Sequence, residues 1–81
     1  NPANSIVSIK WNSDFILSTD IEIYSISGSR IFSKKLVSQK GENELHWYLK
    51  SQEMKKVPSG IYLIKVETSN EVSINKITYL K

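Results

Sequence analysis

Few side chains in this sequence have the chemistry of a catalytic site. His46 is the one histidine among 81 residues, and there is no cysteine. Serines are plentiful, but none lies in a Gly-x-Ser-x-Gly turn or in another context that activates a nucleophile. In the alternating segment ELHWYL (44–49), His46 falls on the face opposite Trp47. We therefore place Trp47 in the core and His46 at the surface, and we predict that the chain is not an enzyme.

The carboxylates do not form an obvious catalytic pair. Asp14 and Asp20 flank a short apolar run, and Glu42 and Glu44 are two residues apart. A glycosidase needs two such groups across a cleft, and a domain of this size has little surface to spare for one. Loop carboxylates and carbonyls could still hold calcium, although no calcium-loop spacing is present. We predict no cofactor and no metal.

The aromatic residues have one functional interpretation, which is a platform on which a sugar stacks. Its members would be Trp11, Tyr24, Trp47, Tyr48 and Tyr79. The alternative is that a small domain needs its aromatic rings for the core. An exposed, coplanar row of rings would favour carbohydrate binding over a structural role.

The charge balance is mildly positive. Eleven Lys and Arg against eight Asp and Glu give a net charge of +3, and Arg30 is the single arginine. Because arginine makes the bidentate contacts of most nucleic-acid readers, we predict no nucleic-acid partner. No apolar run approaches the about 20 residues that span a bilayer, and no basic start followed by an apolar core marks a signal peptide within these residues. The opening NPANS lacks methionine, so we interpret the chain as a fragment or a processed product.

The polar and apolar alternation predicts an all-β chain. Segments rich in Ile, Val, Tyr, Ser and Thr are separated by turn residues, and they predict seven strands at 5–10, 14–18, 21–26, 30–37, 44–49, 61–68 and 72–80. The length suits a single domain, residues 1–81. Seven short antiparallel strands predict an immunoglobulin-like β-sandwich. The one helix-prone segment, 49–56, is short and is limited by Pro58.

The segment VPSGIYLIKVET (57–68) predicts a turn that leads into a core strand. Pro58 fixes its own φ for a turn, and Gly60 is able to take a positive φ two residues later. Tyr62, Ile64 and Val66 then fall on one face, which we assign to the core. The hydroxyl of Tyr62 needs a hydrogen-bond partner near the rim of that core.

Four segments, in this order, resemble the C-terminal sorting domains of the type IX secretion system of Bacteroidota. They are the opening NPANS with Asn1 and Pro2, the turn unit IEIYSISGSRIFSKKL around Gly28, the segment VPSGIYLIKVET, and the closing INKITYLK. The match extends over essentially all 81 residues. Two positions depart from the family pattern, since Ser25 stands where aspartate is usual and Ser29 where arginine is usual. If those positions carry recognition this copy is atypical, although serine can replace aspartate in capping a turn.

A second family shares part of the pattern. The stretch GENELHWYLKSQEMKKVPSGIY resembles the immunoglobulin-like module of flagellar hook-capping proteins and other extracellular bacterial proteins, with Trp47 in the matching place. Both resemblances imply a β-sandwich. The opening NPANS and the closing NKITYLK favour the sorting domain. The alternative functions are therefore a spacer or a carbohydrate-binding accessory module.

The sorting-domain resemblance implies a role without catalysis. Such a domain accompanies its cargo into the periplasm, and the outer-membrane translocon then recognises it. A sortase commonly removes it, and the cargo is released or attached to the cell surface. Our hypothesis is that Gly60, Tyr62, Lys76 and Lys81 mark the recognised end, with Gly60 and Tyr62 mainly structural and the lysines at the surface. Simple solvation is the alternative for the lysines, and an open edge strand there would permit strand addition or a weak dimer.

Overall fold

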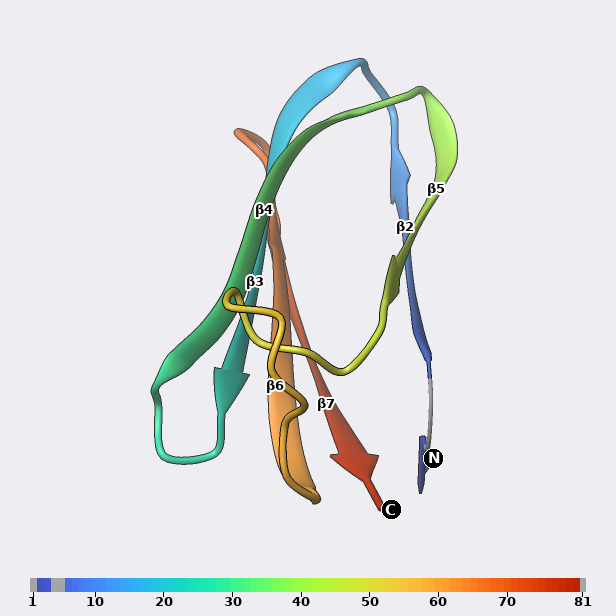
Figure 1. Ribbon diagram of the computed structural model, residues 1–81. Coiled ribbons are helices and arrows are strands. Elements are labelled where there is room, and N and C mark those ends of the chain that lie inside the picture. Colours follow the sequence, from blue (N-terminus) through green and yellow to red (C-terminus); the bar gives the residue numbers. More distant parts are fainter. Residues whose placement is uncertain (1, 4–5, 81) are drawn as a thin grey trace.

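The fold consists of two sheets. The computed structural model describes residues 2–3 and 6–80, and the regular elements of this part of the chain are all strands. They are β1 (Pro2–Ala3), β2 (Val7–Ser13), β3 (Leu17–Ser25), β4 (Arg30–Ser38), β5 (Gly41–Trp47), β6 (Gly60–Glu67) and β7 (Val72–Tyr79). A five-stranded sheet has the order β1-β7-β6-β3-β4, and β2 and β5 form the second sheet (Figure 1). The predicted all-β sandwich is confirmed.

Two details of the predicted strands are wrong. The segment 14–18 is not a separate strand, because β3 begins at Leu17 and continues without a break to Ser25. The residues before it turn the chain from one sheet to the other, with the Ser13 hydroxyl donating to the Phe15 carbonyl at 2.6 Å. The pairing is also not wholly antiparallel, because β1 runs parallel to β7. A two-residue strand has no alternation from which its pairing could be predicted.

The core lies between the sheets, on one face of the central strands. Ile21 and Ile23 of β3 are fully buried, and beside them β6 buries the predicted set Tyr62, Ile64 and Val66. These two strands pair antiparallel, so residues that lie opposite each other share a face. Burying one such aliphatic side chain stabilises the fold by about 1.5–3 kcal/mol. The prediction of a core face on residues 61–68 is therefore confirmed.

The second sheet closes the core with a tryptophan. Trp47 ends β5 and is 2% exposed. Its ring lies edge-on to Tyr62, with ring centroids 5.6 Å apart and planes at 70°. Its indole Nε1 donates to the Lys50 carbonyl at 2.9 Å, so the polar atom of the ring is satisfied. The alternation in 44–49 thus placed both residues correctly, since His46 is exposed.

A small polar cluster also joins the sheets. Trp11 on β2 donates from Nε1 to the Ser38 hydroxyl on β4 at 2.8 Å. That hydroxyl also bonds the Thr19 hydroxyl, which lies within hydrogen-bond distance of the Leu17 carbonyl at 3.1 Å. Ser38 and Thr19 are fully buried, and buried polar groups are stable when every one has a partner. No periodicity in the sequence indicated this cluster.

The segment between β5 and β6, which we call the 49–57 loop, forms a compact reversal of the chain. Lys50 and Lys56 are bridged, and the Val57 amide donates to the Leu49 carbonyl at 3.1 Å. Leu49 has φ +61, and both Leu49 and Val57 are buried. The helix-prone segment 49–56 is therefore part of a non-helical loop. Buried Leu49 and Val57 anchor the two ends of this loop in the core.

Candidate recognition surface

The last two strands form a tight hairpin. β6 and β7 pair over eight residues, from Gly60 opposite Tyr79 to Glu67 opposite Val72. In the turn, the Thr68 amide donates to the Glu71 carbonyl at 2.9 Å. The Thr68 hydroxyl accepts from the amides of residues 70 and 71 at 3.1 and 3.2 Å. Threonine closes turns in this way. These bonds fix the turn, and the turn holds β7 in register with β6.

The two faces of β7 have different roles. Ile77 and Tyr79 face inward and pack against the core. The outward residues Val72, Ile74 and Lys76 are exposed, and Ile74 is 61% exposed. We call these three outward residues, together with the free edge of the strand beside them, the β7 surface. It combines apolar side chains with one cation.

The edge of β7 is largely unpaired. β1 pairs with β7 only opposite Thr78 and Tyr79. Over residues 72–77, no strand in the described part of the chain lies on the side of β7 away from β6. An unpaired edge presents rows of backbone donors and acceptors that can bind another strand. The β7 surface is thus the place where the five-stranded sheet offers backbone pairing.

The Pro-Ser-Gly-Ile-Tyr segment holds the other end of the hairpin. The Tyr62 hydroxyl donates to the Pro58 carbonyl four residues upstream, so the predicted partner exists. Burial, followed by the nearby Tyr79, raises the pKa of the Tyr62 phenol. The arrangement matches the tyrosine corner of immunoglobulin-like sandwiches. The Tyr62 ring lies in the core, and its hydroxyl is bonded to the turn before β6. Tyr62 is therefore not exposed to a partner.

The expectation for Gly60 is wrong. Gly60 is the first residue of β6, and the positive φ values of the described glycines occur elsewhere, at Gly28 and Gly41. A side-chain carbon at Gly60 would meet no atom within 4 Å. The reversal is made by the residues before Gly60, so its conformational freedom is not used.

The β3–β4 turn explains the serines that depart from the family pattern. The Ser25 amide donates to the Ser29 carbonyl at 2.8 Å, and the Gly28 amide donates to the Ser25 carbonyl at 2.9 Å. Gly28 has φ +95, where other residues are strained. The Ser25 and Ser27 hydroxyls lie 2.8 Å apart. Both departures therefore lie in the turn between β3 and β4, and β6 separates Ser25 from β7.

The outward face of the central strands is charged and internally paired. Glu22 lies 3.0 Å from the Arg30 guanidinium and 3.7 Å from the Lys65 ammonium. The Tyr24 hydroxyl donates to Glu22 at 2.8 Å, and this bond is the main cause that lowers the pKa of Glu22. A hydrogen bond to Glu67 is the main cause that raises the pKa of Lys65. These charged groups are paired with one another, whereas none of the ion pairs in the described part of the chain involves the β7 surface.

We expect the Glu22 network to make the free energy of unfolding decrease at acid pH. The pKa of Glu22 is lower in the folded state than its ordinary value of 4.5, so its stabilisation is present above that value. The stabilisation is lost as the pH falls through the folded-state pKa. Glu22→Gln should therefore flatten the fall in unfolding free energy below about pH 5. Urea unfolding at a series of pH values measures this. Glu53→Gln, in the exposed 49–57 loop, is the control, and an equal slope in wild type and Glu22→Gln would contradict the prediction.

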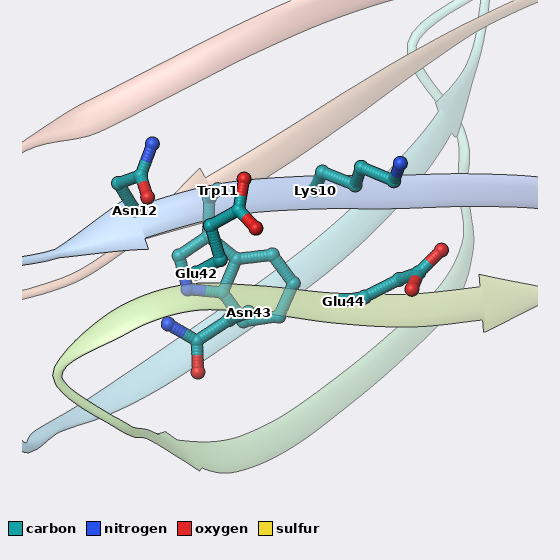
Figure 2. Close-up of a pocket in the computed structure, with 6 residues that line it drawn as sticks. All are labelled: Lys10, Trp11, Asn12, Glu42, Asn43 and Glu44. Carbon is teal, nitrogen blue, oxygen red and sulfur yellow. The ribbon is translucent and has the colours of Figure 1, made fainter.

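The predicted aromatic platform is not formed. Trp47 and Tyr79 are buried, whereas Tyr48 is exposed. Trp11 is half-buried and borders a depression of about 330 Å³, which is lined by Lys10, Trp11, Asn12, Glu42, Asn43 and Glu44 (Figure 2). The Asn43 amide there already bonds the backbone of the adjacent turn. The depression therefore has neither an aromatic row nor unused buried polar groups.

Of the side chains considered for catalysis, His46 and Glu44 lie together at the surface of β5. His46 lies 3.1 Å from Glu44 on β5, and both side chains are about half exposed. His46 is the main cause that lowers the pKa of Glu44. Within the described residues, no three His, Asp or Glu side chains gather as metal ligands. Over the same residues, no helix has the length and apolarity needed to cross a membrane.

The comparison with protein families decides between the two resemblances. The model of the secretion system C-terminal sorting domain matches residues 1–79. The chain belongs to this family. It is a non-catalytic sorting signal of type IX secretion, and it works with the type IX machinery in export to the cell surface or the medium. The spacer and carbohydrate-binding alternatives are not favoured.

The fold has a counterpart among solved structures. The crystal structure of dimeric latent PorU from Porphyromonas gingivalis matches 99% of this chain with a TM-score of 0.82 and 20% sequence identity. This chain corresponds to 8% of the length of that one. The likeness shows that the two share a fold. No curated protein sequence matches this chain.

The site residues suggested by the sequence are dispersed over the domain. Lys76 is exposed on the β7 surface, while Tyr62 and Trp47 touch each other in the core. Pro58 accepts the bond from Tyr62, and Pro2 pairs with β7 through the backbone of β1. Asn1 and Lys81 lie outside the described residues. Sequence reasoning raised an open edge at the last strand, but it could not say which residues are free, because that depends on strand order: β1 pairs only with residues 78 and 79.

Proposed function

We propose that the outer-membrane translocon reads this sorting domain at the β7 surface, by adding a strand to the free edge of β7. The observation that supports this is the unpaired edge over residues 72–77 beside exposed apolar side chains. In strand addition, backbone hydrogen bonds supply affinity and alternate side chains supply specificity. On the inward face of β7, Ile77 and Tyr79 are committed to the core. The outward Val72, Ile74 and Lys76, which are all exposed, are therefore the residues that we expect to specify the partner.

The remaining members of the suggested site have different roles in this proposal. Gly60 and Tyr62 hold the start of β6, and thereby the register of the hairpin. Lys76 supplies a charge at the surface, and Lys81 extends the recognised end. The domain and its cargo pass through the periplasm, and a sortase then removes the domain or exchanges it for a surface anchor. A second copy of the domain is a competing occupant of the same edge, which would give a weak dimer.

An export assay tests the proposal. Residues 1–81 are fused behind a periplasmic signal peptide and a fluorescent reporter, in a Bacteroidota host with and without a working translocon. The test variant is Ile74→Ser with Lys76→Glu. The control is Ile26→Ser with Lys34→Glu, because Ile26 is 64% exposed and Lys34 is also exposed, but both lie away from β7.

We expect the test variant to lower translocon-dependent export about tenfold, which corresponds to a loss of about 1.4 kcal/mol in binding. The control should be exported as the wild type is. Equal export of both variants, with both folded by circular dichroism, would show that the translocon does not read the β7 surface. Equal export in hosts with and without the translocon would contradict the wider proposal.

A further inference from the structure

The other edge of the five-stranded sheet is covered. β4 is the last strand on that side, and Gln52 of the 49–57 loop bonds it twice. The Gln52 amide donates to the Ile31 carbonyl at 2.9 Å, and the Ser33 amide donates to the Gln52 side-chain oxygen at 2.8 Å. In an antiparallel strand, alternate residues direct both backbone groups to the same side. Gln52 thus takes the place of a neighbouring strand at residues 31 and 33.

Two further features of β4 oppose strand pairing. β3 pairs Tyr24 with Arg30 and Ile23 with Phe32, which leaves Ile31 as an extra residue in a bulge. A bulge increases the local twist of an edge. Farther along the strand, Lys34 and Lys35 are both exposed, and lysines on an edge discourage pairing with another chain. Residues 72–77 of β7 have neither a bulge nor a covering side chain in the described structure.

The 49–57 loop sets the position of Gln52 independently of β4. The Ser51 amide donates to the Lys55 carbonyl at 2.8 Å, and the Met54 amide donates to the Ser51 carbonyl at 2.9 Å. Leu49 and Val57 anchor the two ends in the core. Met54 has φ +65, a strained value for a residue with a side chain. The loop thus adopts a specific conformation that presents Gln52 to the edge of β4.

We propose that the 49–57 loop is an edge cover, which closes β4 to strand pairing and leaves β7 as the edge open to a partner. The physical consequence concerns assembly. A sheet with one open edge can accept one strand or form a closed pair, whereas a sheet with two open edges can add copies without limit. Within the five-stranded sheet, the cover therefore confines strand pairing to the β7 edge. This inference concerns the edge opposite β7 and does not depend on which partner the translocon supplies.

Shortening the loop tests this inference. Residues 51–55 are replaced by Asn-Gly, a two-residue turn that can join the bridged Lys50 and Lys56. In sedimentation velocity, the wild type should never exceed a dimer as its concentration rises. The shortened protein should form species larger than a dimer. Adding Lys35→Pro should reverse this, because the Lys35 amide points away from β3 and proline blocks a new strand there. A folded, shortened protein that stops at the dimer would overturn the inference.

A single substitution keeps the test decisive if the shortened protein does not fold. Gln52→Ala removes the acceptor of the Ser33 amide. Hydrogen exchange of that amide should become about fivefold faster, as expected for the loss of one hydrogen bond of about 1 kcal/mol. Gln39→Ala, on the exposed turn before β5, is the control. Unchanged exchange at Ser33 in Gln52→Ala would show that Gln52 does not cover the edge.

Discussion

Replacing Trp47 with alanine is expected to lower the free energy of unfolding by about 3–5 kcal/mol. The ring is 2% exposed, lies edge-on to Tyr62 and donates to the Lys50 carbonyl. The substitution leaves a cavity, removes a ring contact and leaves the partly buried Lys50 carbonyl without its donor. A domain with a total stability of about 5–15 kcal/mol loses a large share of it. The smaller second sheet has few other side chains that could fill the space.

Urea unfolding followed by circular dichroism measures this effect. Tyr48→Ala is the matched control, because Tyr48 is the next residue and is 57% exposed. Its loss should change the free energy of unfolding by less than about 0.5 kcal/mol. Similar effects of the two substitutions would mean that Trp47 does not organise the core as described.

Removing residues 72–81 is expected to abolish export. β7 pairs with β6 along its whole length, and it contributes Ile77 and Tyr79 to the packing of the core. The truncation therefore removes the strand that we propose the translocon reads, and it exposes the edge of β6 as well. Both losses act in the same direction, so the expected effect exceeds that of any surface substitution.

The reporter export assay measures the effect, and protease resistance of the periplasmic protein separates the two causes. If the truncated domain is degraded while Ile74→Ser with Lys76→Glu is folded and retained in the periplasm, both the fold and the β7 surface are required. Normal export of the truncated protein would be incompatible with recognition at the last strand. Normal export of the folded double variant would confine the role of β7 to stability.

The two edges suggest how a sorting signal can remain independent of its cargo. The charged outward face of the central strands pairs within itself, through Glu22 and its neighbours. Gln52 covers one edge of the sheet, and the other edge is open. If the translocon reads β7 as we propose, the groups that it contacts are backbone groups and a few outward side chains of the domain itself, so recognition does not require any group of the cargo.

The pattern of residues determined much of the central sheet. Alternation placed Tyr62, Ile64 and Val66 in the core, and the polar tip of Tyr62 required a partner near the rim. Such inferences succeed because the side-chain period of a strand is local and strictly alternating. The family resemblance then supplied the function, because a sorting role is not encoded in the chemistry of any single side chain.

Tertiary structure alone decided which residues of the last strand are free and what covers the opposite edge of the sheet. The segment 14–18 has strand-like composition, yet Ser13 turns the chain there between the two sheets. In the sequence, nothing distinguishes Gln52 from other loop residues. Its role follows only from the folded structure, in which it bonds the edge of β4. Gly60 is able to take a positive φ, but in this fold it does not. Strand order and edge contacts depend on residues far apart in the chain, so their physical basis is long-range packing, which local periodicity does not contain.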